Sequence, residues 1–296
     1  MSKMLKITGK TVWILVMTIL ALIFAYPFFY GLLGSLMVQQ EFGNMGTLLP
    51  IPTNPTGVNY RFVFSLDGAI GPLVNSLCRA AWYTFWVVIM SLLCGYVLGR
   101  YEFKGKKVFV IVIVAAQVVP SVLTLIPTFV LVANIPFLGG NNWAGVGGHG
   151  LINNKAMLYL LLHWGWLLWV FLFMQSIRSF PRAFEEAAEI DGCGFWAILF
   201  RIVVPMQGPI LAVIAINTAL SNWNDWLTPF LYINQVKDST LSAWLGTLTA
   251  NLQQFGEKDY PKVFALATVA IIPPFLILLF LQKYIIQGIA SAGVKG

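Results

Sequence analysis

The sequence predicts an all-α, polytopic membrane protein. Of its 296 residues, 58% are hydrophobic and only 10% are charged, and its mean hydropathy is +0.80. An ordinary soluble domain carries charge on about a quarter of its residues. Long charge-free runs favour helices over a closed barrel, because no stretch shows the two-residue alternation of a barrel strand. The chain is therefore expected to cross a bilayer with helices.

Six apolar runs with at most one charged residue each approach or exceed the length of about 20 residues that crosses a bilayer core. No separate soluble domain remains, so we expect a single transmembrane domain over residues 1–296. Prolines within several runs predict kinks, which are tolerated where neighbouring helices or water take up the freed carbonyl groups. The first run is too long for a signal-peptide core and is interpreted as an uncleaved span. The predicted spans are residues 11–37, 74–99, 108–133, 156–177, 206–233 and 263–286.

The placement of Lys and Arg predicts the orientation of these spans. Cations gather in the N-terminal segment and in the loops after the second, fourth and sixth predicted spans. Because cytoplasmic loops are the basic ones, this pattern predicts that both termini are cytoplasmic. The opposite loops hold fewer cations: Arg61, Lys155, Lys237, Lys258 and Lys262.

Four of the eleven acidic residues fall within seven positions between the fourth and fifth predicted spans. Placing four carboxylates at the bilayer centre would cost on the order of 10 kcal/mol, so this loop is expected outside the hydrocarbon. The residues from Arg182 to Ile190 favour a helix. Phe184, Ala187 and Ala188 have the spacing of one helix face, and the carboxylates lie mostly around that face. Gly192 follows where a helix would stop. The four acidic residues are Glu185, Glu186, Glu189 and Asp191.

A second apolar stripe follows this glycine and ends at Pro205. Residues 181–205 are therefore predicted to form two short helices that meet at a glycine bend. Periodicity alone leaves two interpretations open: a solvated hairpin at the membrane interface, or a surface that binds a partner. The residues of the second stripe are Phe195, Leu199 and Ile202.

The spacing of Glu186-Ala187-Ala188, Gly192, Ile202 and Val204-Pro205 resembles the EAA motif of ATP-binding cassette importer permeases. Val204 stands where the family has Leu. Further segments resemble MalG-type permeases of maltose-family carbohydrate importers. These segments are Asn75-Ser76, Asn222-Trp223-Asn224-Asp225-Trp226 and Ala292-Gly293-Val294-Lys295-Gly296.

This resemblance implies a type I importer permease in a bacterial inner membrane. Residues 181–205 would then contain a coupling helix that docks on a cytoplasmic ATPase subunit, and the tail at residues 288–296 would reach the ATPase dimer. ATP and Mg would bind those partner subunits, and no cofactor is expected in this chain. The implied ATPase-coupling residues are Glu185, Glu186, Ala187, Ala188, Asp191, Gly192, Ile202, Pro205, Lys295 and Gly296.

The same resemblance implies further partners, namely a second, MalF-like permease and an extracytoplasmic sugar-binding protein. The glycine-rich segment before the fourth span is expected to be a flexible external loop that contacts the binding protein, although a plain connector is also possible. Aromatic and amide side chains near Asp225 suit a sugar but equally suit an interfacial aromatic belt. The candidate contacts are Gly139, Gly140, Asn141, Asn142, Trp143, Trp223, Asn224 and Asp225.

Other single residues receive structural interpretations. Arg79 lies near the start of the second span, at its outer end, and is expected to snorkel to the headgroups rather than steer an acidic sugar. Gly95 and Gly99 form a G-x-x-x-G pair that predicts close helix packing. Asp225 is a functional candidate because it lies in or near a span, or else it caps a helix or pairs locally.

Two rival functions fit the sequence less well. A secondary transporter predicts inverted repeats or acidic residues near the midplane of the membrane, and Asp225 is the only candidate for such an acidic residue. A membrane enzyme needs a cluster of catalytic side chains, whereas His149 and His163 lie in different segments. Gly9-Lys10-Thr11 ends like a nucleotide-binding loop but lacks the preceding glycine and strand. Maltose-like, other neutral and uronate-containing oligosaccharides all remain open as substrates.

Overall fold

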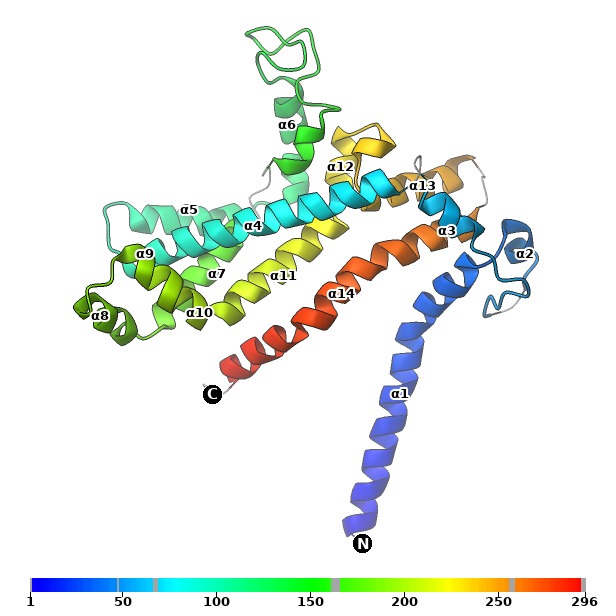
Figure 1. Cartoon of the computed structure of the whole chain (residues 1–296), viewed down its shortest axis with the longest axis horizontal. Helices are drawn as coiled ribbons and strands as arrows, with labels where there is room; N and C mark the ends of the chain where they lie inside the picture. Colours follow the sequence, from blue (N-terminus) through cyan, green and yellow to red (C-terminus); the bar gives the residue numbers. More distant parts are fainter. Residues whose placement is uncertain (1, 47, 66–68, 161–165, 256–258, 294–296) are drawn as a thin grey trace. The chain divides into compact units, whose positions relative to one another are not determined.

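The computed structural model describes residues 2–46, 48–65, 69–160, 166–255 and 259–293 (Figure 1). Every regular element in these residues is a helix. The chain forms two compact units: Met1–Ile70 with Leu245–Ile272, and Gly71–Trp244 with Pro273–Gly296. The predicted all-helical fold is confirmed in this described part.

The first unit contains α1 (Ser2–Ser35), the short helices α2 (Gln39–Gly43) and α3 (Val58–Val63), and parts of α13 (Leu241–Phe255) and α14 (Tyr260–Gly293). Aromatic rings join its elements, since the ring centroids of Tyr30 and Phe42 each lie within 5.8 Å of that of Phe264. Most apolar side chains of α1 from position 12 onward are exposed, which suits a helix that contacts lipid or another chain.

The second unit is organised around α4 (Ile70–Arg100), which packs against α7 (Trp166–Ser179). A Cβ on Gly95 would lie 3.0 Å from the Val170 carbonyl oxygen, and one on Gly99 would lie 2.7 Å from Cγ2 of Ile177. The predicted close helix packing at these glycines is confirmed, because any side chain there would collide with α7.

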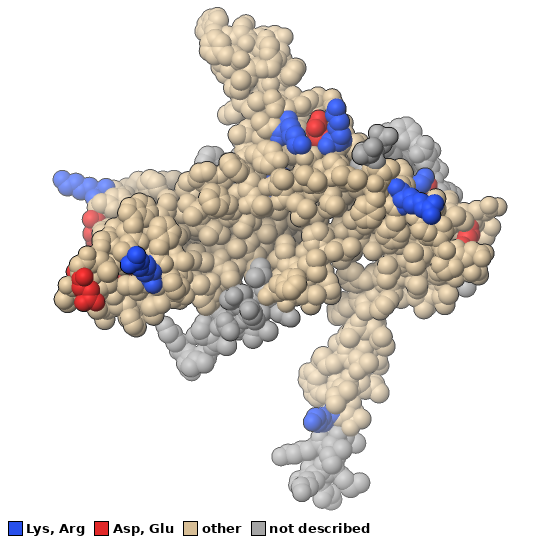
Figure 2. All heavy atoms as spheres, in the orientation of Figure 1, with Lys and Arg blue, Asp and Glu red and all other residues tan. Residues whose placement is uncertain are grey.

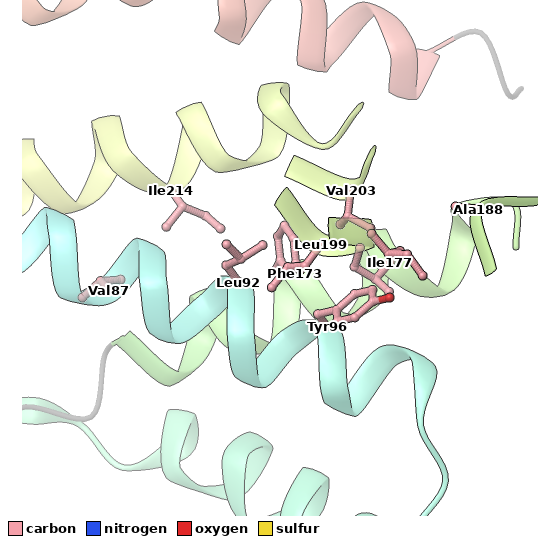
Figure 3. Close-up of a cluster of buried hydrophobic side chains, with 10 residues drawn as sticks. Val87, Leu92, Tyr96, Phe173, Ile177, Ala188, Leu199, Val203 and Ile214 are labelled. Atoms are coloured by element: carbon pink, nitrogen blue, oxygen red, sulfur yellow. The ribbon is translucent and has the colours of Figure 1, made fainter. Parts of the chain in front are cut away.

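A buried apolar cluster continues from this contact to the short helices after α7 (Figure 3). Tyr96 of α4 and Phe173 of α7 lie in it beside Leu199 and Val203, and Ile214 joins from α11 (Gly208–Asn224). This cluster fixes the position of α8 (Ala183–Ile190) and α9 (Phe195–Ile198) at the C-terminal end of α4 (Figure 1).

The helices differ from the predicted spans where proline or a polar residue interrupts them. Pro120 separates α5 (Lys106–Val118) from α6 (Ser121–Ala133), and the two are bent by 102°. A residue before proline avoids the helical region, and Val119 is accordingly extended, with ψ of 113°. The fifth predicted span comprises α11 and α12 (Leu227–Tyr232), which are separated at Asp225.

The number of spans stays a prediction. Three described helices are long and apolar enough to cross a membrane, or up to five if each bent pair is one span. In the fourth predicted span, the 3-10 helix η1 (Lys155–Tyr159) is followed by α7, which has 14 residues. Helix α13 was not anticipated from the sequence. Charged side chains are sparse over the face shown in Figure 2.

Candidate functional site

The EAA-like segment begins with α8, an eight-residue helix that ends at a glycine stop. The Gly192 N–H donates to the Glu189 carbonyl at 3.0 Å, and the Cys193 N–H donates to the Ala188 carbonyl at 2.9 Å. These two bonds and the Gly192 φ of 81° form a Schellman motif, in which a left-handed residue closes the helix. The predicted glycine bend is confirmed.

One face of α8 is fixed to the end of α4 through Glu185. Arg100 Nη2 lies 2.6 Å from Glu185 Oε1, and the Tyr96 hydroxyl donates to Oε2 at 3.1 Å. A further Arg100 Nη2 bond, of 2.9 Å, reaches the Phe180 carbonyl. Because the Glu185 and Arg100 side chains are only 10% and 6% exposed, this ion pair is an internal connection between the two helices.

The sequence pattern placed the acids around the apolar face, whereas the structure places Glu185 on the inner face of α8; its predicted contact with an ATPase subunit stays a prediction. That carboxylate is buried beside Ala188, whereas Ala187 is exposed. The sequence pattern could not show this, since the cation that compensates Glu185 belongs to a helix 85 positions earlier.

The opposite face of α8 is exposed and combines small, apolar and acidic side chains. Ile190 is 86% exposed and lies between exposed carboxylates. We call this surface the α8 outer face. Its exposed residues are Ala183, Glu186, Ala187, Glu189, Ile190 and Asp191.

The chain returns from Gly194 through α9, a π-helical turn η2 (Leu199–Val203) and α10 (Val204–Met206). Pro205 has no N–H to donate to the preceding turn, and a wider π turn next to a proline accommodates that loss. Ile202 packs against the apolar cluster, while Pro205 is exposed. The π turn was not anticipated from the sequence.

The glycine-rich loop after α6 is compactly folded. Asn141 Nδ2 donates to the carbonyls of Ala133 and Ile135 at 2.9 and 3.0 Å, and Asn141 Oδ1 accepts from the Gly148 N–H at 2.8 Å. A Cβ on Gly139 would lie 2.0 Å from the Gly150 carbonyl oxygen, so the backbone at the two ends of the loop is in close contact. The structure thus shows a braced loop where the sequence suggested a flexible one.

This loop presents Trp143, which is 78% exposed, from its outer part. The loop extends from the end of α6 away from α4 (Figure 1). Asn142 supports the turn that carries the indole, because its Oδ1 accepts from the Ala144 and Val146 N–H groups at 2.8 and 3.1 Å. Asn141 is therefore a buried brace, whereas the other predicted contact residues of this loop are exposed, namely Gly139, Gly140, Asn142 and Trp143.

Arg79 does not snorkel, contrary to expectation. Its side chain is 2% exposed, and its Nη2 lies 2.6 Å from Asp225 Oδ2. Asp225 Oδ1 also accepts from the Thr228 N–H at 3.1 Å, which caps α12. Asp225 thus bonds the first turn of α12, as the capping interpretation expects, but its ion-pair partner is not local, because Arg79 lies 146 positions away in the sequence.

The neighbours of Asp225 do not form one aromatic surface. Trp223 is only 2% exposed, so its ring cannot stack on a sugar in this arrangement. Asn224 and Trp226 are exposed. The predicted contact group of Trp223, Asn224 and Asp225 is therefore divided between the interior and the surface.

Comparison with known families identifies the family of this chain. Residues 91–291 match the family model described as the binding-protein-dependent transport system inner membrane component. The matched residues include the whole EAA-like segment. The chain belongs to this permease family. It is a family of transport permeases rather than an enzyme class, and its members are inner-membrane components.

Curated relatives of this permease align along most of their length. The arabinooligosaccharides transport system permease AraQ of Bacillus subtilis is 30% identical, with 94% of this chain and 92% of AraQ covered. The polygalacturonan/rhamnogalacturonan transport system permease YtcP of the same organism is 28% identical, with 93% and 94% covered. The resemblance to carbohydrate importer permeases is confirmed.

A solved structure shows the same fold. The permease matches a chain of a bacterial ABC transporter that imports the acidic polysaccharide alginate, with a TM-score of 0.71 and 20% identity. The match covers 94% of this permease and 96% of that chain. The predicted type I importer permease fold is thus confirmed.

Three predicted positions lie outside the described residues, namely Lys295 and Gly296 of the tail, and His163. The sequence did not predict two ion pairs, Arg100 with Glu185 and Arg79 with Asp225. Charge is scarce in the long second run, which contains Arg79 and is followed by Arg100, and this scarcity could have indicated that each arginine has a carboxylate partner. A lone arginine in an apolar helix is best interpreted by asking which carboxylate it pairs with.

Proposed function

We propose that this chain is one of two homologous permease subunits of an ATP-driven importer that moves an oligosaccharide delivered by an extracytoplasmic binding protein. Two cytoplasmic ATPase subunits bind ATP and Mg, and this chain contributes no nucleotide site. Gly9-Lys10-Thr11 lies inside α1, whereas a phosphate-binding loop follows a strand.

The arrangement of α8 carries this proposal. A helix whose inner face is locked by an ion pair and whose outer face exposes Ile190 between carboxylates is suited to transmit force from a partner. The partner fills the α8 outer face, and the Glu185–Arg100 connection passes its movement to α4. The apolar cluster of Figure 3 spreads that movement to α7 and α11.

Loop charge supports a cytoplasmic position for α8 and for both termini. The braced loop that carries Trp143 is then external, where it contacts the binding protein. The tail residues Lys295 and Gly296 are proposed to reach the ATPase pair.

The names of the relatives support a carbohydrate substrate. Besides AraQ and YtcP, the chain is 27% identical to the melibiose/raffinose/stachyose import permease MelC of Bacillus subtilis, with 95% of this chain and 96% of MelC covered. These names include both neutral and acidic saccharides. Relatives alone therefore leave the charge of the sugar undecided.

Photo-crosslinking tests the docking surface. A photoreactive phenylalanine derivative at Ala187 of the α8 outer face is expected to crosslink to the ATPase subunit in membranes that contain the assembled importer. The control is the same derivative at Asn234, which is exposed and predicted to lie outside. Crosslinking to the ATPase from position 234 alone, or from neither position, contradicts the proposed orientation and docking.

A further inference from the structure

A cavity of about 300 Å³ lies in the second unit among α4, α6, α11 and α12. This volume is at the small end of the range of ligand pockets, which is about 300–1,000 Å³. It suits one sugar unit of a longer chain. Its lining mixes leucine and valine with hydrogen-bonding side chains: Thr124, Thr128, Ser221, Asn222, Asp225 and Thr228.

Asn222 contributes a buried amide to this lining and is 5% exposed. Its Nδ2 donates to the Thr218 carbonyl at 2.9 Å. Its Oδ1 has no hydrogen-bond partner in the part of the chain that the structure describes, but this atom is also closed to water. The groups that a ligand can reach are therefore Asp225 and the hydroxyl side chains.

Arg79 also lines the cavity, and three of its five N–H groups donate to partners within the chain. Nε donates to the Leu158 carbonyl at 3.2 Å, Nη1 to the Asn222 carbonyl at 3.3 Å, and Nη2 to Asp225 at 2.6 Å. The guanidinium carbon lies 5.2 Å from the centroid of the Tyr83 ring. The charge of this cation is thus compensated by Asp225.

The exposed partner of the pair is the anion. Asp225 is 22% exposed, whereas Arg79 is 2% exposed, so the carboxylate is the more accessible charge in the cavity wall. Carboxylate oxygens accept hydroxyl hydrogen bonds well and repel a second carboxylate. The accessible chemistry of the lining is therefore acceptor-rich and negative.

We infer that this cavity binds a neutral, polyhydroxylated sugar unit through Asp225 and the hydroxyl side chains of its lining, and that the Arg79–Asp225 pair disfavours uronates. This inference rests on the proposed sugar-import function and chooses between the neutral and acidic substrates that the relatives leave open. It also gives this subunit a direct substrate contact.

Equilibrium binding to the purified permease–ATPase complex in nanodiscs tests the inference. The binding protein is left out so that its own selectivity does not enter. The probes are three radiolabelled trisaccharides of matched length: raffinose, arabinotriose and trigalacturonate. At least one neutral probe is expected to bind about tenfold more tightly than trigalacturonate, as repulsion between like charges predicts.

Changing Asp225 should change this ratio. Asp225→Asn leaves Arg79 as a net positive charge, so the ratio of neutral to trigalacturonate affinity is expected to fall about tenfold. Asp238→Asn is the matched control, because it makes the same charge change in η3 (Val236–Asp238), outside the cavity lining. The ratio should not change in this control.

A second variant covers the case in which an unpaired Arg79 prevents folding. Arg79→Met with Asp225→Leu removes both charges, and such replacements of buried pairs are often neutral or stabilising. This double variant is expected to bind the neutral probe more weakly and to lose its discrimination against trigalacturonate. Unchanged discrimination would overturn the inference, as would tighter binding of trigalacturonate by the unaltered permease or no binding of any probe.

Uptake by proteoliposomes separates this inference from the proposed function. The complete importer with its binding protein is supplied with ATP and each trisaccharide. Failure to take up any of them contradicts the proposed function. ATP-dependent uptake together with unaltered selectivity in the Asp225 variants contradicts the cavity alone.

Discussion

Both ends of α4 pair an arginine with a distant carboxylate, but the two pairs have different surroundings. At the C-terminal end, Glu185 and Arg100 are both at most 10% exposed and are enclosed by Tyr96 and Phe180. Near the N-terminal end, Arg79 is buried while Asp225 is 22% exposed beside a cavity. The exposure of the carboxylate, rather than the pair itself, distinguishes the proposed mechanical connection from the proposed binding surface.

The largest expected effect comes from breaking the enclosed pair. Glu185→Ala leaves Arg100 buried without its carboxylate, and loss of one partner of a buried pair costs about 3–5 kcal/mol. We expect a clear fall in the thermal unfolding midpoint, measured by tryptophan fluorescence of the purified complex. ATP hydrolysis per sugar transported should also rise, because α8 is no longer fixed to α4.

Glu186→Ala is the matched control for this variant. It removes the same side chain one position later, on the α8 outer face. Its unfolding midpoint is expected to stay close to that of the unaltered permease. Equal losses of stability in the two variants would mean that Glu185 is not the enclosed residue.

The next largest effect is expected from a change in packing near the C-terminal end of α4. Gly95→Ala adds a Cβ that would lie 2.9 Å from Phe173 Cδ1 and 3.1 Å from the Met174 nitrogen. Overpacking of this kind costs about 1–3 kcal/mol. We expect a lower unfolding midpoint and weaker coupling of ATP hydrolysis to uptake, with the selectivity between neutral and acidic trisaccharides unchanged.

Gly31→Ala in α1 is the control, because a Cβ there meets nothing within 4 Å. In a helix this change is neutral or stabilising by up to about 1 kcal/mol. A change in sugar selectivity with Gly95→Ala would contradict the proposal that coupling and selectivity depend on opposite ends of α4.

A smaller effect is expected at the glycine stop of α8. Gly192→Ala costs about 1–2 kcal/mol from its positive φ alone, since no atom lies within 4 Å of the added Cβ. Gly192→Pro also removes the N–H that bonds Glu189, so it should uncouple ATP hydrolysis from uptake while membrane insertion is retained.

Gly194→Ala is the control for the glycine stop, because Gly194 has an ordinary φ of −80° and open space around it. The uptake assay and the unfolding midpoint are compared across the three variants. Normal coupling in Gly192→Pro would contradict the role proposed for this bend.

The sequence predicted the features that depend on local patterns. Gly192 follows a short amphipathic run, and Gly95 with Gly99 follows helical spacing, so both could be interpreted without tertiary structure. The match of the EAA spacing indicated the family for the same reason. Each of these signals lies within a few turns of one helix.

The pairs that define the two ends of α4 could not be predicted in this way. Arg79 meets Asp225, and Arg100 meets Glu185, only because helices distant in the sequence pack together. The single-helix pattern therefore placed Glu185 on the outside and Arg79 toward the headgroups. The bend at Pro120 shows a related limit, since a proline predicts an interruption but not its angle of 102°.

The smallest effect is expected at a third pair, which lies in the loop after α4. Lys106 Nζ lies 2.7 Å from Glu102 Oε1, and this hydrogen bond, with the charge of Lys106, lowers the pKa of the exposed Glu102 carboxyl from its ordinary value. A lowered pKa in the folded state stabilises the fold above the ordinary value, and the effect is lost as the pH falls through the folded-state pKa. Lys106 also donates to the Tyr101 carbonyl at 2.9 Å and keeps a partner without Glu102.

Glu102→Gln is therefore expected to leave the unfolding midpoint at pH 7 nearly unchanged, because the Glu102 side chain is 84% exposed and solvent screens its interaction with Lys106. Any small difference between the midpoints of the variant and the unaltered permease should vanish as the pH falls through the lowered folded-state pKa of Glu102. Thermal unfolding between pH 3 and pH 7 measures both. A loss at pH 7 as large as that of Glu185→Ala would show that enclosure of the carboxylate is not what separates strong from weak pairs at this end of α4.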